Sequence, residues 1–68
     1  MTHGEYINAC QRTEYKDMPA RLLNEGTGEI GPLQQCLWLE APEAMLVKVN
    51  DELTTWWPEG IRDISEEL

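Results

Sequence analysis

Nucleophilic catalysis requires a nucleophilic side chain beside a base, and the chain has few residues that can fill these roles. His3 is its only histidine and Ser65 is its only serine, and 61 positions lie between them. No local motif joins the two residues. The sequence therefore predicts no catalytic residues, and we expect a protein that is not an enzyme.

Pairs of carboxylates are the second kind of group that can do chemistry, because they can hold Mg²⁺ or share acid–base work. The candidate pairs are Glu25 with Glu29, Glu40 with Glu43, and Asp51 with Glu52. Only Glu40 and Glu43 are one helical turn apart, and Pro42 between them argues against a continuous helix. In a chain with 13 acidic residues such spacings arise by chance. We expect no metal site and no cofactor.

A short stretch of the chain is similar to a known enzyme family. Glu5-Tyr6-Ile7, Arg12-Thr13-Glu14 and Arg21-Leu22-Leu23-Asn24 resemble the opening of some phage MazG-like nucleotide pyrophosphohydrolases. The resemblance implies an all-α, magnesium-dependent enzyme, which is an alternative function. That family needs Glu-x-x-Glu followed by Glu-x-x-Asp. Here Glu25 and Glu29 are four apart and no Glu-x-x-Asp follows them, so we do not transfer the activity.

The charge balance narrows the range of partners. The formal net charge is −8, and residues 31–68 contain 8 acidic and 2 basic side chains. Nucleic acids and anionic membranes attract a surplus of Lys and Arg, so we expect neither as a direct partner. No apolar run approaches the roughly 18 residues of a membrane span, and the first residues lack the features of a secretory signal. We expect one cytoplasmic domain, residues 1–68.

The tryptophans suggest where a partner binds. Trp38 is expected in the core, whereas Trp56 and Trp57 are adjacent and one of them can remain exposed. Trp is enriched at the energetic centres of protein interfaces, and acidic side chains steer a protein toward a basic surface. The predicted partner-binding residues are Asp51, Glu52, Trp56, Trp57, Glu59 and Asp63.

These features predict a non-catalytic acidic protein that docks on a basic host protein and inhibits or modulates it. A nuclease or another nucleic-acid-binding complex fits this description, since an acidic surface can compete for its nucleic-acid site. Phage and mobile-element inhibitors, such as anti-CRISPR and anti-restriction proteins, are analogous in type. A third alternative is an assembly adaptor that works as a homo-oligomer, because so short a chain buries little surface by itself.

The elements that must position these residues are expected to be helical. Thr2 and Glu5 have the spacing of a capping box, which predicts a helix from about His3 to Thr13. A second short helix is expected after Asp17, with Leu22 and Leu23 facing the core and Gly26 ending it. The segment 24–32 contains three glycines and a proline and is expected to be a loop.

The spacing of apolar residues after Pro42 favours a longer amphipathic helix. Leu46, Val49, Leu53 and Trp56 are three, four and three residues apart. Ile61, Ile64 and Leu68 have similar spacings, which indicates a short terminal helix. The predicted fold class is therefore all-α, with four or five short helices around one core. The alternative is α+β, with Leu33–Leu39 and Met45–Val49 forming a hairpin. Cys10 and Cys36 are expected to be reduced and buried.

Overall fold

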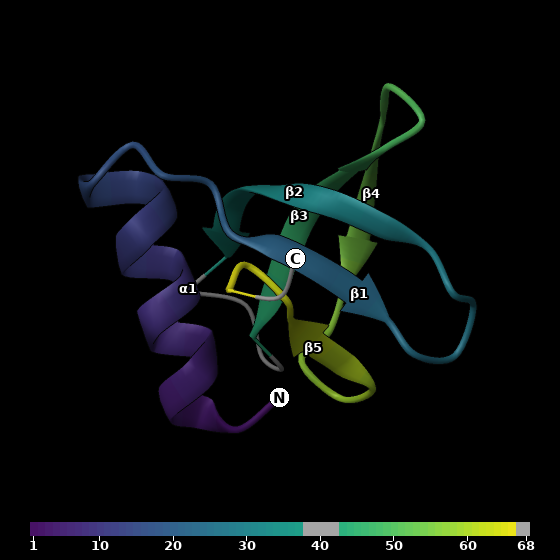
Figure 1. The fold of residues 1–68 in the computed structure, drawn as a ribbon, viewed down its shortest axis with the longest axis horizontal. Coiled ribbons are helices and arrows are strands. Elements are labelled where there is room, and N and C mark those ends of the chain that lie inside the picture. Colours follow the sequence, from purple (N-terminus) through teal and green to yellow (C-terminus); the bar gives the residue numbers. More distant parts are fainter. Residues whose placement is uncertain (38–42, 67–68) are drawn as a thin grey trace.

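The computed structural model describes residues 1–37 and 43–66, and in these residues one helix precedes five strands (Figure 1). The elements are α1 (His3–Tyr15), β1 (Arg21–Asn24), β2 (Ile30–Leu37), β3 (Ala44–Val49), β4 (Glu52–Trp56) and β5 (Ile61–Asp63). The strands form one antiparallel sheet in the order β4-β3-β2-β1-β5. The fold is α+β.

The predicted all-α bundle is therefore wrong, and so is the all-α fold implied by the MazG-like resemblance. The alternative arrangement agrees with the structure in one respect, since β2 and β3 pair antiparallel with Leu33 opposite Val47. The expectations for Trp38, Leu39, Glu40, Pro42 and Leu68 lie outside the described residues.

The first helix is confirmed, and it begins with the expected capping box. The Glu5 N–H donates to Thr2 Oγ1 at 3.1 Å, and the Thr2 N–H donates to Glu5 Oε1 at 3.1 Å. These bonds satisfy two backbone N–H groups that a helix start otherwise leaves unpaired. The helix buries Tyr6, Ala9 and Cys10 on the face toward the sheet. Asp17, with a φ of 51°, follows its end in the left-handed conformation.

The second predicted helix is wrong, because residues 21–24 form β1. Leu22 is fully buried, whereas Leu23, its neighbour along the strand, is only partly buried on the opposite face. This alternation is that of a strand with one face in the core. The predicted loop is right for residues 25–29 only, since β2 already begins at Ile30 and includes Gly31 and Pro32.

The long predicted helix is a β-hairpin. β3 and β4 pair from Val49 opposite Glu52 to Met45 opposite Trp56, and a two-residue turn joins them. Asn50 and Asp51 both have a positive φ, 51° and 67°, as a type I′ hairpin turn requires. The terminal helix is likewise absent from the described residues, where 61–63 form β5.

The hairpin separates the residues that the helix prediction placed on one buried face. Val49 and Trp56 are buried, whereas Leu46 is only partly buried. Leu53 is 64% exposed. In a helix, residues seven apart such as 46 and 53 lie on the same face. In a strand, successive side chains point to opposite faces, so this spacing does not place both residues in the core of the hairpin.

The sheet bends strongly at β2, whose first half pairs with β1 and whose second half pairs with β3 (Figure 1). Gly31 permits this close crossing, because a Cβ at this position would lie 2.3 Å from the Lys48 carbonyl oxygen. The pairing register shifts between Leu33 and Gln35. This bulge inserts Gln34 as an extra residue, so that both Leu33 and Cys36 face the core.

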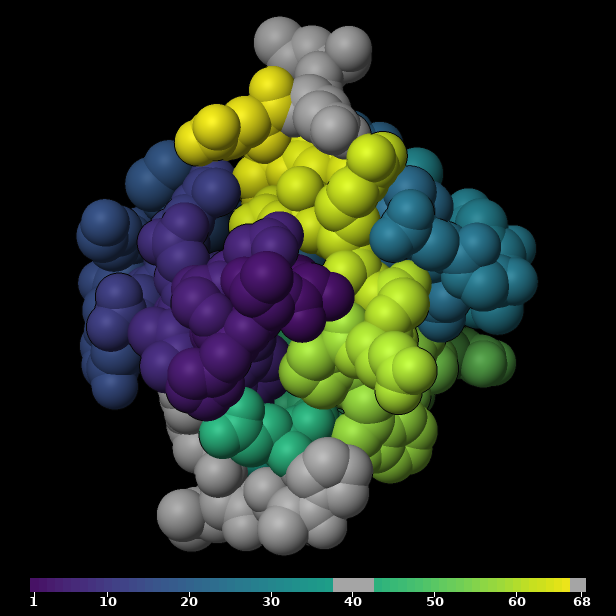
Figure 2. Space-filling view, turned by 90° about the horizontal axis from the view of Figure 1, so that it is seen from below, coloured from purple at the N-terminus to yellow at the C-terminus, as the bar shows by residue number. Residues whose placement is uncertain are grey.

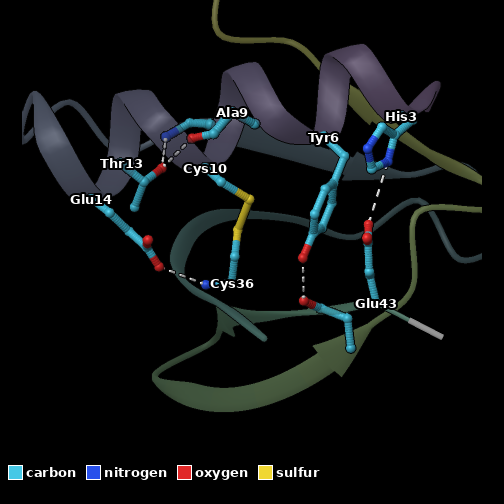
Figure 3. The surroundings of a disulfide bond; sticks show 10 residues. His3, Tyr6, Ala9, Cys10, Thr13, Glu14, Cys36 and Glu43 are labelled. Atoms are coloured by element: carbon cyan, nitrogen blue, oxygen red, sulfur yellow. Dashed lines mark hydrogen bonds and ion pairs between the residues drawn. A yellow bond between two sulfur atoms is a disulfide. The ribbon is translucent and has the colours of Figure 1, made fainter. Parts of the chain in front are cut away.

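A disulfide joins α1 to the sheet, between Cys10 and Cys36 (Figure 3). The expectation of two reduced cysteines is therefore wrong. Their Cα atoms are 6.0 Å apart, within the usual range for a disulfide. The Glu14 carboxylate accepts a hydrogen bond from the Cys36 N–H at 3.0 Å, and the Tyr6 hydroxyl donates to the Ala44 carbonyl at 3.2 Å. The helix is thus held on the sheet by covalent and polar contacts as well as by packing.

Candidate partner-binding edge

A groove lies beside the end of β4, where this strand approaches the start of β5. It has a volume of about 340 Å³ and is lined by Asn24, Thr55, Trp56, Trp57, Glu59 and Ile61. We call it the Trp57 groove. Trp56 is only 5% exposed and belongs to the core, whereas Trp57 is 50% exposed. Of the two tryptophans whose exposure the sequence left open, Trp56 is a core residue and Trp57 is the one that a partner can contact.

Two turns that contain exposed acidic residues meet beside the Trp57 groove. The Glu25 N–H donates to the Gly60 carbonyl at 2.9 Å, which brings the 25–29 turn against the 58–60 turn. Figure 2 shows the light-green residues around 57–60 beside the blue residues of the 25–29 turn. Glu25, Glu29 and Glu59 are all exposed. The groove therefore combines a half-exposed indole with Glu59, and the neighbouring 25–29 turn adds two exposed acidic residues nearby.

Strand β4 connects the Trp57 groove to a second acidic position. Asp51 and Glu52 lie at its start, both exposed, and Trp57 and Glu59 follow its end. A strand of five residues spans about 13 Å between its first and last Cα atoms. The predicted residues Asp51, Glu52, Trp56, Trp57 and Glu59 are thus arranged along one strand and its two ends.

β4 is also an edge of the sheet, since β3 is its only neighbour in the strand order of the described residues. In antiparallel pairing, alternate residues direct their N–H and C=O groups toward the neighbouring strand and the others direct them away. Glu52 and Val49 close the two-residue turn as a hydrogen-bonded pair. It follows that Leu53 and Thr55 direct their backbone groups away from β3.

Asp63 lies apart from this arrangement, in a different hollow that Glu5, Asn8, Arg12 and Glu66 also line. Its Oδ2 atom is 3.9 Å from Arg12 Nη1. Its Oδ1 atom accepts hydrogen bonds from both the N–H and the hydroxyl of Ser65. Ser65 in turn accepts a hydrogen bond from the Arg21 N–H at 2.9 Å. These contacts hold the C-terminal part of the chain against β1, and they give Asp63 a structural role.

The groups considered for catalysis have separate partners. His3 Nδ1 is 3.4 Å from Glu43 Oε2 beside the start of α1 (Figure 3), whereas Ser65 contacts Asp63 and the Arg21 backbone. Among residues 1–37 and 43–66, no three His, Cys, Asp or Glu side chains are grouped so that they could hold a metal ion. Whether the protein catalyses a reaction stays a prediction from the sequence.

Burial changes the acidity of one side chain. Desolvation raises the pKa of the Tyr6 hydroxyl, and the negative charges of Glu43 and Glu14 raise this pKa further. The hydroxyl is a hydrogen-bond donor to Ala44 in this buried position, which is possible only while it is protonated. The Tyr6 side chain is buried on the face of α1 toward the sheet and does not line the Trp57 groove, so its pKa concerns stability and not the candidate site.

Sequence reasoning did not place Asn24, Glu25 or Glu29 at the candidate site. Their position depends on the pairing of β1 with β5, in which Asn24 lies opposite Ile61. That pairing joins segments 37 residues apart, and no local pattern indicates it. Glu25 and Glu29 were singled out only as a carboxylate pair, and here they lie in the turn that is hydrogen-bonded to the 58–60 turn beside the groove.

Comparisons with known proteins add no assignment: no protein family model, no curated protein sequence and no solved structure matches this chain. None of the helices in the described residues is long and apolar enough to cross a membrane.

Proposed function

We propose that this protein is a non-catalytic acidic binding protein that docks on a basic surface of another protein. The observation that carries the proposal is the Trp57 groove, where an indole that is 50% exposed lies beside Glu59, and where the acidic 25–29 turn is hydrogen-bonded to the 58–60 turn. An exposed tryptophan beside carboxylates suits a Lys or Arg side chain, since the indole face attracts cations and the carboxylates form ion pairs with them.

The net charge of −8 supports the same partner chemistry. An acidic protein accelerates its encounter with a basic surface and repels acidic ones. If the basic surface is the nucleic-acid site of a nuclease or a related complex, docking there excludes the nucleic acid. Inhibition by occupation of such a site is the activity that we propose, in the manner of phage and mobile-element inhibitors.

The disulfide supports a proposal about the compartment. The sequence led us to expect a cytoplasmic protein, but disulfides persist mainly in oxidising compartments. The Cys10–Cys36 bond therefore favours an oxidising compartment or an oxidising stage of the life of the protein. Alkylation of free thiols in freshly lysed source cells, followed by mass spectrometry, would show which form exists there. Complete alkylation of both cysteines would contradict this assignment.

Capture and kinetics together test the docking function. Proteins from a lysate of the source organism are bound to the immobilised chain at low salt, and each retained protein is purified and tested alone. We expect a basic partner whose association slows as salt is added, because salt screens charges over about 8 Å at physiological ionic strength. We expect Trp57→Ala to weaken its binding by about 30-fold, equivalent to roughly 2 kcal/mol for a central tryptophan.

The matched control for Trp57→Ala is Tyr15→Ala, which removes another exposed aromatic side chain, from the end of α1. Circular dichroism of both free variants shows whether they remain folded. A purified partner whose affinity is the same for folded Trp57→Ala and for wild type, and whose association ignores salt, would refute the proposed function.

A further inference from the structure

The edge of β4 carries an inference about how the basic partner binds, which rests on the proposed function. The residues Glu52–Trp56 pair with β3 without a bulge. Proteins protect exposed edges with Lys, Pro, bulges or very short strands, to prevent other chains from pairing with them. β4 has no Lys, Pro or bulge within its five residues, and its one charged residue, Glu52, lies at its first position. The opposite edge, β5, has only three residues and includes Arg62.

We propose that an extended segment of the basic partner pairs with β4 as an additional strand. The Leu53 and Thr55 N–H and C=O groups would form its main-chain hydrogen bonds, as in other cases of strand addition. Leu53 is 64% exposed and the Thr55 side chain is exposed, so both offer side-chain contacts to the incoming strand.

The charges at the two ends of β4 indicate what this segment carries. Asp51 and Glu52 stand at the start of the strand, and Glu59 stands beyond its end, next to Trp57. A partner segment with a Lys or Arg near each of its ends places one cation at each acidic position. The cation at the Trp57 end also meets the indole face. The occupant is therefore an extended, basic segment whose cationic side chains lie about four to six residues apart.

A second copy of this chain fits the same edge less well. An antiparallel pair of β4 strands about a two-fold axis at Thr54 places Glu52 of one copy opposite Trp56 of the other. The acidic start of one strand then approaches Glu59 of the other copy, and each copy has a net charge of −8. Like charges so close oppose the association.

The test uses the whole protein and a synthetic peptide of about eight residues, which at about 3.3 Å per residue covers β4 and reaches beyond both ends. The peptide has Lys at both ends and alternating Thr and Val between them. A matched control peptide has the same sequence but carries N-methyl groups at alternate residues, so that it keeps the charge and cannot pair as a strand. Amide hydrogen exchange is followed by nuclear magnetic resonance.

In the free protein we expect the Leu53 and Thr55 amides to exchange faster than the Thr54 and Trp56 amides, which face β3. When about nine-tenths of the protein is bound, exchange at Leu53 and Thr55 should slow by about tenfold, because only the free form exchanges. The N-methylated peptide should produce no such protection. Thr55→Pro should abolish binding of the first peptide, whereas Thr55→Val, which keeps the N–H group, should retain it.

Other outcomes would overturn strand addition, and they are distinguishable from failure of the proposed function. If the peptide changes the tryptophan fluorescence of the wild type but not of Trp57→Ala, without slowing exchange at Leu53 and Thr55, docking at the Trp57 groove stands and strand pairing is wrong. Equal protection by both peptides, or no binding of either, also contradicts strand pairing. If these amides are already protected in the free protein, and more so at higher protein concentration, the occupant of the edge is a second copy.

Discussion

Cys10 of α1 and Cys36 of β2 are joined by a disulfide, 26 positions apart in the sequence, and their bond is the covalent link between helix and sheet. Both side chains are buried in the core cluster. The bulge at Gln34 places the Cys36 side chain on the core face of β2, toward the helix. Figure 3 shows the disulfide that Cys36 forms with Cys10. A domain of 68 residues buries a small core, so a cross-link here matters to its stability.

We predict that replacing both cysteines, Cys10→Ala with Cys36→Ala, lowers the free energy of unfolding by about 3 to 4 kcal/mol. A bond that closes a loop of this length removes that much conformational entropy from the unfolded chain in the loop-closure model. Urea titration followed by circular dichroism measures the change. Reductant should destabilise the wild type and leave the double variant unaffected. Equal midpoints for oxidised and reduced wild type would contradict the prediction.

Tyr6→Phe is predicted to cost about 1 kcal/mol, the usual net value of a hydrogen bond, because the buried hydroxyl donates to the Ala44 carbonyl. The substitution also changes the response to alkaline pH. Below about pH 10 the hydroxyl is protonated in both the folded and the unfolded state. Above it, the unfolded chain loses this proton first, because the pKa is raised in the folded protein.

The unfolded state of the wild type therefore binds fewer protons than the folded state above pH 10, and the free energy of unfolding falls as pH rises. Tyr6→Phe should lack this part of the decline. Urea titrations between pH 9 and pH 11 compare the two proteins. A decline of equal steepness in both would show that Tyr6 ionises as easily in the folded protein as in the unfolded chain.

Leucine truncation on the two faces of the sheet should have very different effects. Leu33→Ala is predicted to cost about 2 to 5 kcal/mol, since Leu33 is fully buried. Leu53→Ala is predicted to change stability by less than about 0.5 kcal/mol, because this side chain is mostly exposed. Thermal or urea unfolding of both variants gives the comparison. A large loss for Leu53→Ala would support the helix that the sequence favoured.

A methyl group at Gly31 is predicted to be strongly destabilising, by about 2 kcal/mol or more, because it would meet the Lys48 carbonyl oxygen of the crossing strand. Gly4→Ala is the matched control, since its added Cβ would have no neighbour closer than 3.9 Å. That substitution lies in α1 and should stabilise the protein by up to about 1 kcal/mol through helix propensity. Similar unfolding midpoints for the two variants would rule out the close crossing.

The sequence predicted α1 better than the strands, because the start of a helix depends on neighbouring residues whereas strand pairing depends on residues far apart in the sequence. The capping box of Thr2 and Glu5 is complete within four residues, so the sequence alone was sufficient to locate the start of α1. In the 42–57 region, Val49 and Trp56 are buried in the hairpin and also have helical spacing. What distinguishes the two structures is the turn at Asn50 and Asp51, and Asn-Asp is a weaker turn signal than Asn-Gly.

The candidate site was predictable to the extent that it lies on one hairpin. Asp51, Glu52, Trp57 and Glu59 are near one another in sequence, and their types alone suggested a docking surface. Their arrangement along an edge strand required the register of β3 with β4, and the position of Glu25 beside the 58–60 turn required the pairing of β1 with β5. Long-range pairing of this kind leaves no periodic pattern in the sequence.

The charge at Asp51 offers the sharpest test of steering along β4. Asp51→Asn is predicted to slow association with a basic partner by about two- to threefold at low salt and to leave dissociation nearly unchanged, as is usual for a charge at the rim of an interface. Asp51 has a φ of 67°, and Asn tolerates this left-handed conformation as well as Asp does. The variant should therefore fold normally.

Asp17→Asn is the matched control, since Asp17 is also exposed and also has a positive φ, but lies after the end of α1, away from β4. Both substitutions change the net charge of the protein by the same amount. If the overall charge alone governed the encounter, both variants would slow association equally. If Asp51 steers the partner locally, only Asp51→Asn reduces the association rate, and the difference between the two variants disappears at high salt because the charges are then screened.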